Sequence, residues 1–269
     1  MSRLEATLQD FDLLDRVARG DTWVHGIDPR AKTIVTFVFV LLVASFPRHA
    51  VVELLPLFAY PAVLLIAAHL PLRIFVRPLV LALILAVFIG LANPLLDREP
   101  VRIGDEWQIA AGWLSLASLA LRTTLCVTAV VALVATTGMS RLSHGLARLG
   151  VPRALVTQLQ FLYRYVFLLA DGAHTMLRAR QLRSVGQPLG LATYAPLVGH
   201  LLLHTMDRAD RIHRAMCCRG FHGDVPIGGR WRLRWTDLVF CVVWFAILLW
   251  LRWLPFTEPL GRWLLGRLS

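Results

Sequence analysis

Long apolar stretches constrain this chain more than any other feature. A membrane-crossing helix needs about 20 apolar residues, and windows of this kind cover residues 29–46, 51–70, 75–96, 112–137 and 238–254. Hydrophobic residues make up 57% of the chain and charged residues only 17%, which is outside the usual range of a soluble domain. The sequence therefore predicts an all-α polytopic membrane protein with a bundle of about five transmembrane helices. Asp28 and Pro29 suit the N-cap and first position of the first helix.

Arginine and lysine in the short loops set the expected orientation, because cytoplasmic loops collect them. They are Arg16 and Arg19 before the first window, Arg30 and Lys32 at its start, Arg73 and Arg77 around the start of the third, and Arg141, Arg148 and Arg153 after the fourth. The opposite loops hold fewer, and acidic residues offset Arg98 and Arg102 there. We expect a multi-pass protein of the cell membrane with a cytoplasmic N-terminus. The first 21 residues lack the apolar region of a signal peptide, so the first span is expected to direct insertion.

Residues 138–234 differ in composition from the apolar windows. Arg164 interrupts the first of two apolar runs, 154–170 and 190–206, and arginines follow each run at helical spacing, which is typical of amphipathic helices, although either run could instead cross the membrane. We divide the chain into an N-terminal part with four spans (1–137), a cytoplasmic helical region (138–234), and a last span with its tail (235–269).

Several function classes are disfavoured by what the spans lack. Ion pumps keep ionisable residues within their spans, yet the first, third and fourth windows hold no acidic residue, and Arg122 is the one charge well inside the fourth. We expect Arg122 to be structural, either bonded to a backbone carbonyl or extended to the interface. Lys32 is the only lysine and does not belong to a P-loop, so any ATPase must be another subunit. Basic residues in so apolar a chain mark cytoplasmic faces rather than a nucleic-acid site.

A short pattern occurs twice in the cytoplasmic region, 36 residues apart and without a gap. The matched pairs are Asp171 with Asp207, Ala173 with Ala209, Arg178 with Arg214, Ala179 with Ala215, Arg183 with Arg219, and Ser184 with Gly220. Each copy starts acidic and turns basic, as the helix dipole favours, and ends in an arginine beside a small residue. A solvated basic helix end explains one copy but not two. Two such ends suit two similar grooves on a dimeric partner, because a small residue permits close approach and a guanidinium offers a fork of donors.

Motifs along most of the chain resemble the transmembrane T component of energy-coupling-factor transporters, in the CbiQ form found in cobalt and nickel uptake systems. In chain order they are HGIDPRAK, ANPLLD, LARLGVPRALV, FLYRY, RARQLRS and RADRIHRAMCCRGFHG. The resemblance implies a membrane helical bundle with long cytoplasmic coupling helices, no catalytic activity and no cofactor. It also implies two ATP-binding-cassette ATPase subunits of the CbiO kind as partners, a membrane S component like CbiM or NikM that binds the solute, and a small subunit like CbiN or NikN, besides membrane lipids.

In this family an arginine motif at the end of each of two coupling helices inserts into a groove on an ATPase subunit. The motifs fall on Leu182, Arg183 and Ser184, and on Cys218, Arg219 and Gly220. Leu182 and Cys218 depart from the more frequent alanine but are apolar, so we expect the role to be kept with a different fit. Supporting residues are Arg178, Ala179, Asp207, Arg214, Ala215, Phe221 and Gly223. Tyr163, Arg164 and Tyr165 are expected to contact the S component or lipid headgroups, or to lie at the membrane interface.

Three alternatives remain open. His213, Cys217, Cys218 and His222 contain zinc-ligand residue types, but adjacent cysteines point about 100° apart on a helix and no second cluster completes four ligands. His200, His204 and His213 could serve an integral-membrane enzyme, although no suitably spaced carboxylates accompany them. The same scaffold could instead serve an importer of a vitamin such as biotin. We expect no metal site and an importer of cobalt or nickel.

Overall fold

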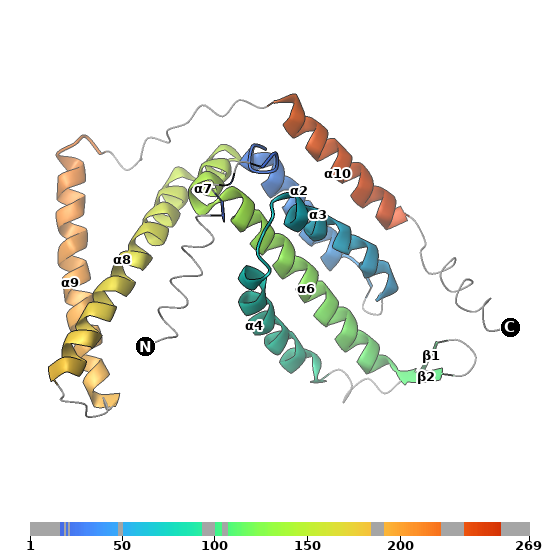
Figure 1. Cartoon of the computed structure of the whole chain (residues 1–269), viewed down its shortest axis with the longest axis horizontal. Helices are drawn as coiled ribbons and strands as arrows, with labels where there is room; N and C mark the ends of the chain where they lie inside the picture. Colours follow the sequence, from blue (N-terminus) through green and yellow to red (C-terminus); the bar gives the residue numbers. More distant parts are fainter. Residues whose placement is uncertain are drawn as a thin grey trace. The chain divides into compact units, whose positions relative to one another are not determined.

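The computed structural model describes residues 17–18, 20, 22–47, 51–92, 100–103, 107–183, 191–221 and 234–253 (Figure 1). Its elements are α2 (Pro29–Ala44), η1 (Val52–Phe58), α3 (Ala59–Ala67), α4 (Arg73–Gly90), β1 (Pro100–Ile103), β2 (Trp107–Ala110), α6 (Ala111–Thr137), α7 (Met139–Arg148), α8 (Arg153–Arg183), α9 (Leu191–Cys217) and α10 (Trp235–Trp253). Helices dominate, which confirms the all-α membrane class. The antiparallel hairpin of β1 and β2, which pairs Pro100 with Ala110, is a feature that the sequence analysis treated as loop.

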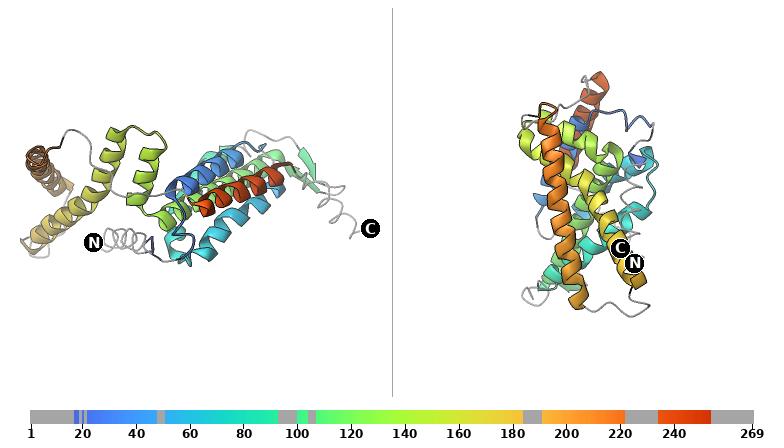
Figure 2. Two further views of the ribbon diagram at one scale, coloured as in Figure 1. Left: turned by 90° about the horizontal axis from the view of Figure 1, so that it is seen from above. Right: turned by 90° about the vertical axis from the view of Figure 1, so that its left-hand side faces the viewer.

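The chain divides into two compact units, residues 1–145 with 231–269 and residues 146–230. In the first unit α6 packs against α2, α3 and α4, while α10 packs against α2 (Figure 2). Rings from three elements meet in its core: the Phe39 and Tyr60 ring centroids lie 4.8 Å apart, and Trp244 meets Tyr60 edge-on at 4.8 Å. The Tyr60 hydroxyl shares a 2.6 Å hydrogen bond with that of Thr36, so its polar end is satisfied inside the bundle.

All five expected spans fall on helical segments, and three have the length and apolar composition to cross a membrane. These three are Arg73–Gly90, Gly112–Thr137 and Trp235–Trp253. The other two segments, α2 and Val52–Ala67, are shorter, and the 16 residues of α2 extend about 24 Å. The second expected span begins with the 3-10 helix η1, and Pro56 lies within that helix.

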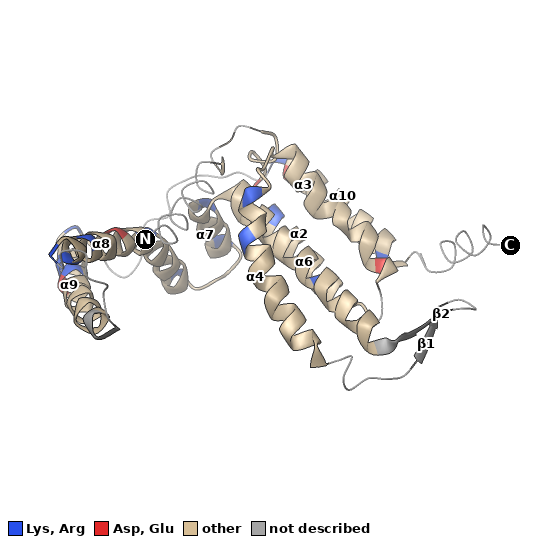
Figure 3. Ribbon diagram, turned by 60° about the horizontal axis from the view of Figure 1, so that its bottom comes forward, with Lys and Arg blue, Asp and Glu red and all other residues tan. Residues whose placement is uncertain are grey.

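The outer surface of the first unit suits contact with lipid. Leu81, Phe88 and Trp250 are 72%, 78% and 63% exposed, which would be costly for a surface that faces water. Charged residues gather towards the ends of these helices, and long stretches of ribbon carry none (Figure 3). Arg122, within α6, donates a hydrogen bond to the carbonyl oxygen of Pro47, so the expected structural role is confirmed.

Candidate functional site

Most of the described residues of the second unit belong to two long helices, α8 and α9, which carry the repeated arginine pattern. Only seven residues separate the end of α8 from the start of α9, and the two helices return past each other so that their C-terminal ends lie at opposite ends of the pair (Figures 1 and 2). They meet near Gly172, where an added Cβ would lie 3.8 Å from Cδ1 of Leu201. A helix rises about 1.5 Å per residue. Counted outward from this contact along both helices, the C-terminal ends of α8 and α9 therefore lie roughly 40 Å apart at most.

The end of α9 has a fully defined backbone that presents Arg219. The Gly220 N–H donates to the Cys217 carbonyl at 3.0 Å, and the Phe221 N–H donates to the Met216 carbonyl at 3.0 Å. This is the Schellman arrangement, in which the residue after the cap is left-handed, and Gly220 has a φ of +82°. Arg219 is therefore the C-cap residue, and its side chain is exposed.

The Schellman turn predicts that a side chain at residue 220 destabilises the end of α9. An alanine there would meet no atom within 4 Å, so Gly220→Ala changes only the backbone preference and should cost about 1 kcal/mol. Hydrogen exchange should show the Phe221 amide exchanging roughly fivefold faster. Gly199→Ala is the matched control, because Gly199 lies within α9 with equally open surroundings, and there alanine should leave exchange unchanged or slow it. Equal effects of the two variants would contradict the capping role of Gly220.

The end of α8 presents the other arginine. Arg183 is the last residue of this helix and is exposed, and the preceding Leu182 is 78% exposed. Ser184 and Gly223, also named from the sequence, lie outside the described residues. The remaining named residues lie on the same two helices or on the turn after α9: Arg178, Asp207, Arg214, Ala215 and Cys218 are exposed, while Ala179 and Phe221 are half-buried.

The cysteine and histidine residues near Arg219 do not form a metal cluster in the described part of the chain. The Cys217 Sγ lies 3.7 Å from Nε2 of His213, and the Phe221 ring stands edge-on to the His213 ring at 6.4 Å. No group of three or more histidine, cysteine or acidic residues that could hold a metal ion is found among the described residues. His222 lies outside them.

Exposed apolar residues on α8 and α9 form a second feature of this unit. Leu162, Val166 and Leu169 on α8, and Val198, Leu202, Leu203 and Met206 on α9, are all exposed. In FLYRY, Arg164 is exposed, whereas Tyr163 and Tyr165 are half-buried and pair with Phe167 and Phe161 at 5.2 and 6.1 Å between ring centroids. Exposed apolar surface of this kind marks a site of contact with a partner or membrane.

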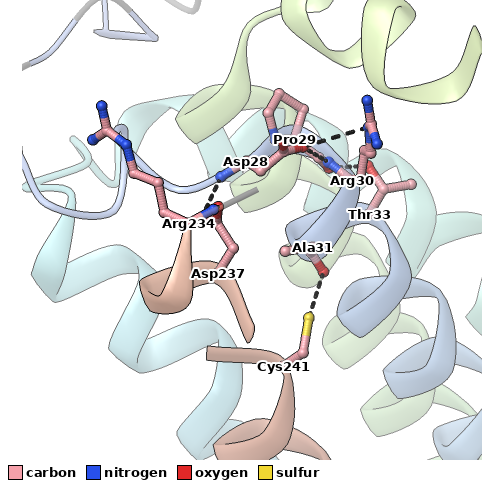
Figure 4. A network of polar contacts seen from close by, with 8 residues as sticks. All are labelled: Asp28, Pro29, Arg30, Ala31, Thr33, Arg234, Asp237 and Cys241. Carbon is pink, nitrogen blue, oxygen red and sulfur yellow. Dashed lines mark hydrogen bonds and ion pairs between the residues drawn. The ribbon is translucent and has the colours of Figure 1, made fainter. Parts of the chain in front are cut away.

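A buried polar network in the first unit was missed by the sequence analysis (Figure 4). Both Asp28 and Asp237 are 2% exposed. One Asp237 oxygen accepts a 2.9 Å hydrogen bond from the Asp28 N–H, and the other accepts a 2.8 Å bond from the Arg234 N–H. The Asp28 carboxylate in turn caps α2 by accepting from the Arg30 N–H at 2.9 Å, as expected. An acidic residue in the first turn of the last span was the available signal for Asp237.

Lys32 belongs to the same end of the first unit. It was interpreted from the sequence as an orientation signal, but its side chain is 2% exposed and its Nζ donates to the Thr136 carbonyl at 3.1 Å. The network thus joins the starts of α2 and α10 to the end of α6.

Comparison with known proteins finds one matching family and several relatives. Residues 20–227 match the CbiQ family, described as cobalt transport protein. The chain is 27% identical to the energy-coupling factor transporter transmembrane protein EcfT of Listeria innocua, with 89% of this chain and 98% of the relative covered. It is 29% identical to the cobalt transport protein CbiQ of Rhodobacter capsulatus, with 80% and 86% covered. It is 25% identical to EcfT of Bacillus subtilis, with 91% and 100% covered.

Proposed function

Because the chain belongs to the CbiQ family of cobalt transport proteins, we propose that it is the non-catalytic T component of an ATP-driven importer for cobalt or nickel ions. Two exposed arginines, each at the C-terminal end of a long helix, support this role most strongly. In this proposal Arg183 and Arg219 enter grooves on two ATPase subunits of the CbiO kind. A separation of up to roughly 40 Å between the helix ends suits two sites on a dimer rather than one groove.

ATP hydrolysis is assigned to the partner subunits. A P-loop requires a lysine that reaches the nucleotide phosphates, and the single lysine of this chain is buried against the Thr136 carbonyl. The chain therefore acts mechanically: closure of the ATPase dimer moves the ends of α8 and α9, and the helices pass this motion on.

The S component, of the CbiM or NikM kind, would bind the exposed apolar faces of α8 and α9. Leu162 and Val166 with Met206 offer apolar contact area, and Arg164 adds a cation for the rim or for lipid headgroups. A small subunit of the CbiN or NikN kind would complete the complex. In this arrangement the protein is a multi-pass component of the cell membrane with its N-terminus in the cytoplasm.

The transported solute is proposed from the relatives. CbiQ of Rhodobacter capsulatus is named a cobalt transport protein, which favours cobalt or the chemically similar nickel ion. The EcfT relatives are named without a solute, so a vitamin such as biotin is the second candidate. In either case the S component selects the solute.

The proposal is tested by co-purification followed by uptake. The chain expressed with its ATPase and S component should purify as one complex, and cells that hold the complex should accumulate radioactive cobalt or nickel. An ATPase variant without its P-loop lysine should assemble but not support accumulation. Uptake of biotin in place of the metals would select the second candidate, and failure of the ATPase to co-purify would contradict the T-component role.

A further inference from the structure

We propose that Lys32 and Arg141 are positioning residues that clamp the two sides of the joint between α6 and α7, so that the motion of the coupling helices reaches the membrane bundle through a stiff joint. The inference rests on the proposed coupling function. The joint lies between α6 and α7, within the first unit, and α7 leads along the chain to α8.

The joint itself is a sharp break in a nearly continuous helix. Gly138 separates α6 from α7 with a φ of +75°, a left-handed conformation that favours glycine. Its N–H donates to the Val134 carbonyl at 2.8 Å, so the end of α6 is closed in an ordered way. A Cβ on Gly138 would lie 3.1 Å from Cβ of Ala18, so Ala18 packs directly against the break.

Lys32 holds the α6 side of this joint. The carbonyl groups in the last turn of a helix lack partners within that helix. Lys32 supplies a donor there, because its Nζ lies 3.1 Å from the carbonyl oxygen of Thr136, one residue before the end of α6. Thr136 is fully buried, so water does not compete readily for this carbonyl.

Arg141 holds the α7 side. Its Nη2 donates to the Ala18 carbonyl at 2.9 Å and its Nη1 donates to the His25 carbonyl at 3.2 Å. One turn further along α7, Gly145 meets the start of α2, where an added Cβ would lie 3.0 Å from Cβ of Pro29. The helix therefore contacts the bundle through a charged side chain at one point and through close backbone packing at another.

These contacts make independent rotation of α7 costly. The Arg141 guanidinium donates to two backbone carbonyls, and hydrogen bonds of charged groups are the strong ones. The Lys32 side chain closes the end of α6 next to the joint. A turn of α7 about Gly138 would break the Arg141 bonds and strain the contact of Gly145 with Pro29. A force that enters α7 from the coupling helices is thus passed to α2 and α6 instead of being absorbed at the joint.

The test removes the Lys32 donor and measures both the order of the joint and the coupling to uptake. Lys32→Met keeps an unbranched apolar side chain but no donor, and Arg73→Met makes a similar change at an exposed position at the start of α4. In the intact complex, amide exchange in residues 139–148 of Lys32→Met should rise about tenfold. ATPase co-purification and ATP hydrolysis should persist while solute uptake falls about tenfold, and Arg73→Met should match the wild type in all of these measurements.

Unchanged exchange in residues 139–148 of Lys32→Met would overturn the clamp. Faster exchange with full uptake would overturn its part in coupling. If Lys32→Met does not fold, Arg141→Gln is used for the same measurements. Unchanged exchange in residues 139–148 would again overturn the clamp, and faster exchange with full uptake would overturn its part in coupling. A wild-type chain that does not bind an ATPase would contradict the proposed function instead, and the exchange measurement on the purified chain would still judge the clamp.

Discussion

Replacement of Arg219 by glutamate is expected to abolish co-purification of the ATPase and ATP-dependent uptake. Arg219 is exposed and is held at the C-cap of α9 by backbone hydrogen bonds alone, so the variant should fold normally. In a groove that accepts a guanidinium, the substitution removes the donors and adds a buried negative charge. Removing one partner of a buried charge pair costs about 2–5 kcal/mol, so the affinity should fall at least about 30-fold.

Matched variants separate the motif from general charge effects. Arg208→Glu makes the same change at an exposed position on the same helix, and it should leave the complex intact. Arg219→Lys keeps the charge but loses the fork of donors, so it should bind weakly. Arg183→Glu should act like Arg219→Glu at the other ATPase subunit. Unchanged coupling in the double variant of Arg183 and Arg219 would refute the assignment, and equal loss in Arg208→Glu would show that net charge, not the motif, matters.

The membrane part of the fold was predictable because it depends on local pattern. Apolar windows of spanning length became helices at the expected places, and the α2 cap by Asp28 followed from the sequence Asp-Pro. The long helices α8 and α9 followed from arginines at helical spacing. Each of these features is decided by residues close together in the chain.

The buried network was not predictable in the same way, because its partners are far apart in sequence. Asp28 and Asp237 are separated by 209 positions, and Lys32 and Thr136 by 104. A lysine beside a predicted span fits the positive-inside pattern equally well whether it faces water or a helix end. Only the packing of α10 and α6 against α2 distinguishes these possibilities.

Asp237→Ala is expected to produce the largest loss of stability. The Asp237 carboxylate accepts two backbone hydrogen bonds while 2% exposed, and one of the donors is the buried N–H of Asp28 at the cap of α2. Alanine would leave that N–H unsatisfied and would remove the charged acceptor from the start of α10. The free energy of unfolding should fall by about 3 kcal/mol, measured by denaturation of the detergent-solubilised protein.

The Asp237→Asn variant separates the hydrogen bonds from the charge. Asparagine keeps one oxygen acceptor in the same shape, so one backbone N–H stays satisfied and the loss should be about half that of alanine. The Asp28 carboxylate lies close to Asp237 because its own N–H bonds to that side chain. If the two variants are equally unstable, the charge of Asp237 matters more than the acceptor geometry. If alanine has no effect, the network does not join α10 to α2, and the apolar packing around Trp244 must hold the last helix alone.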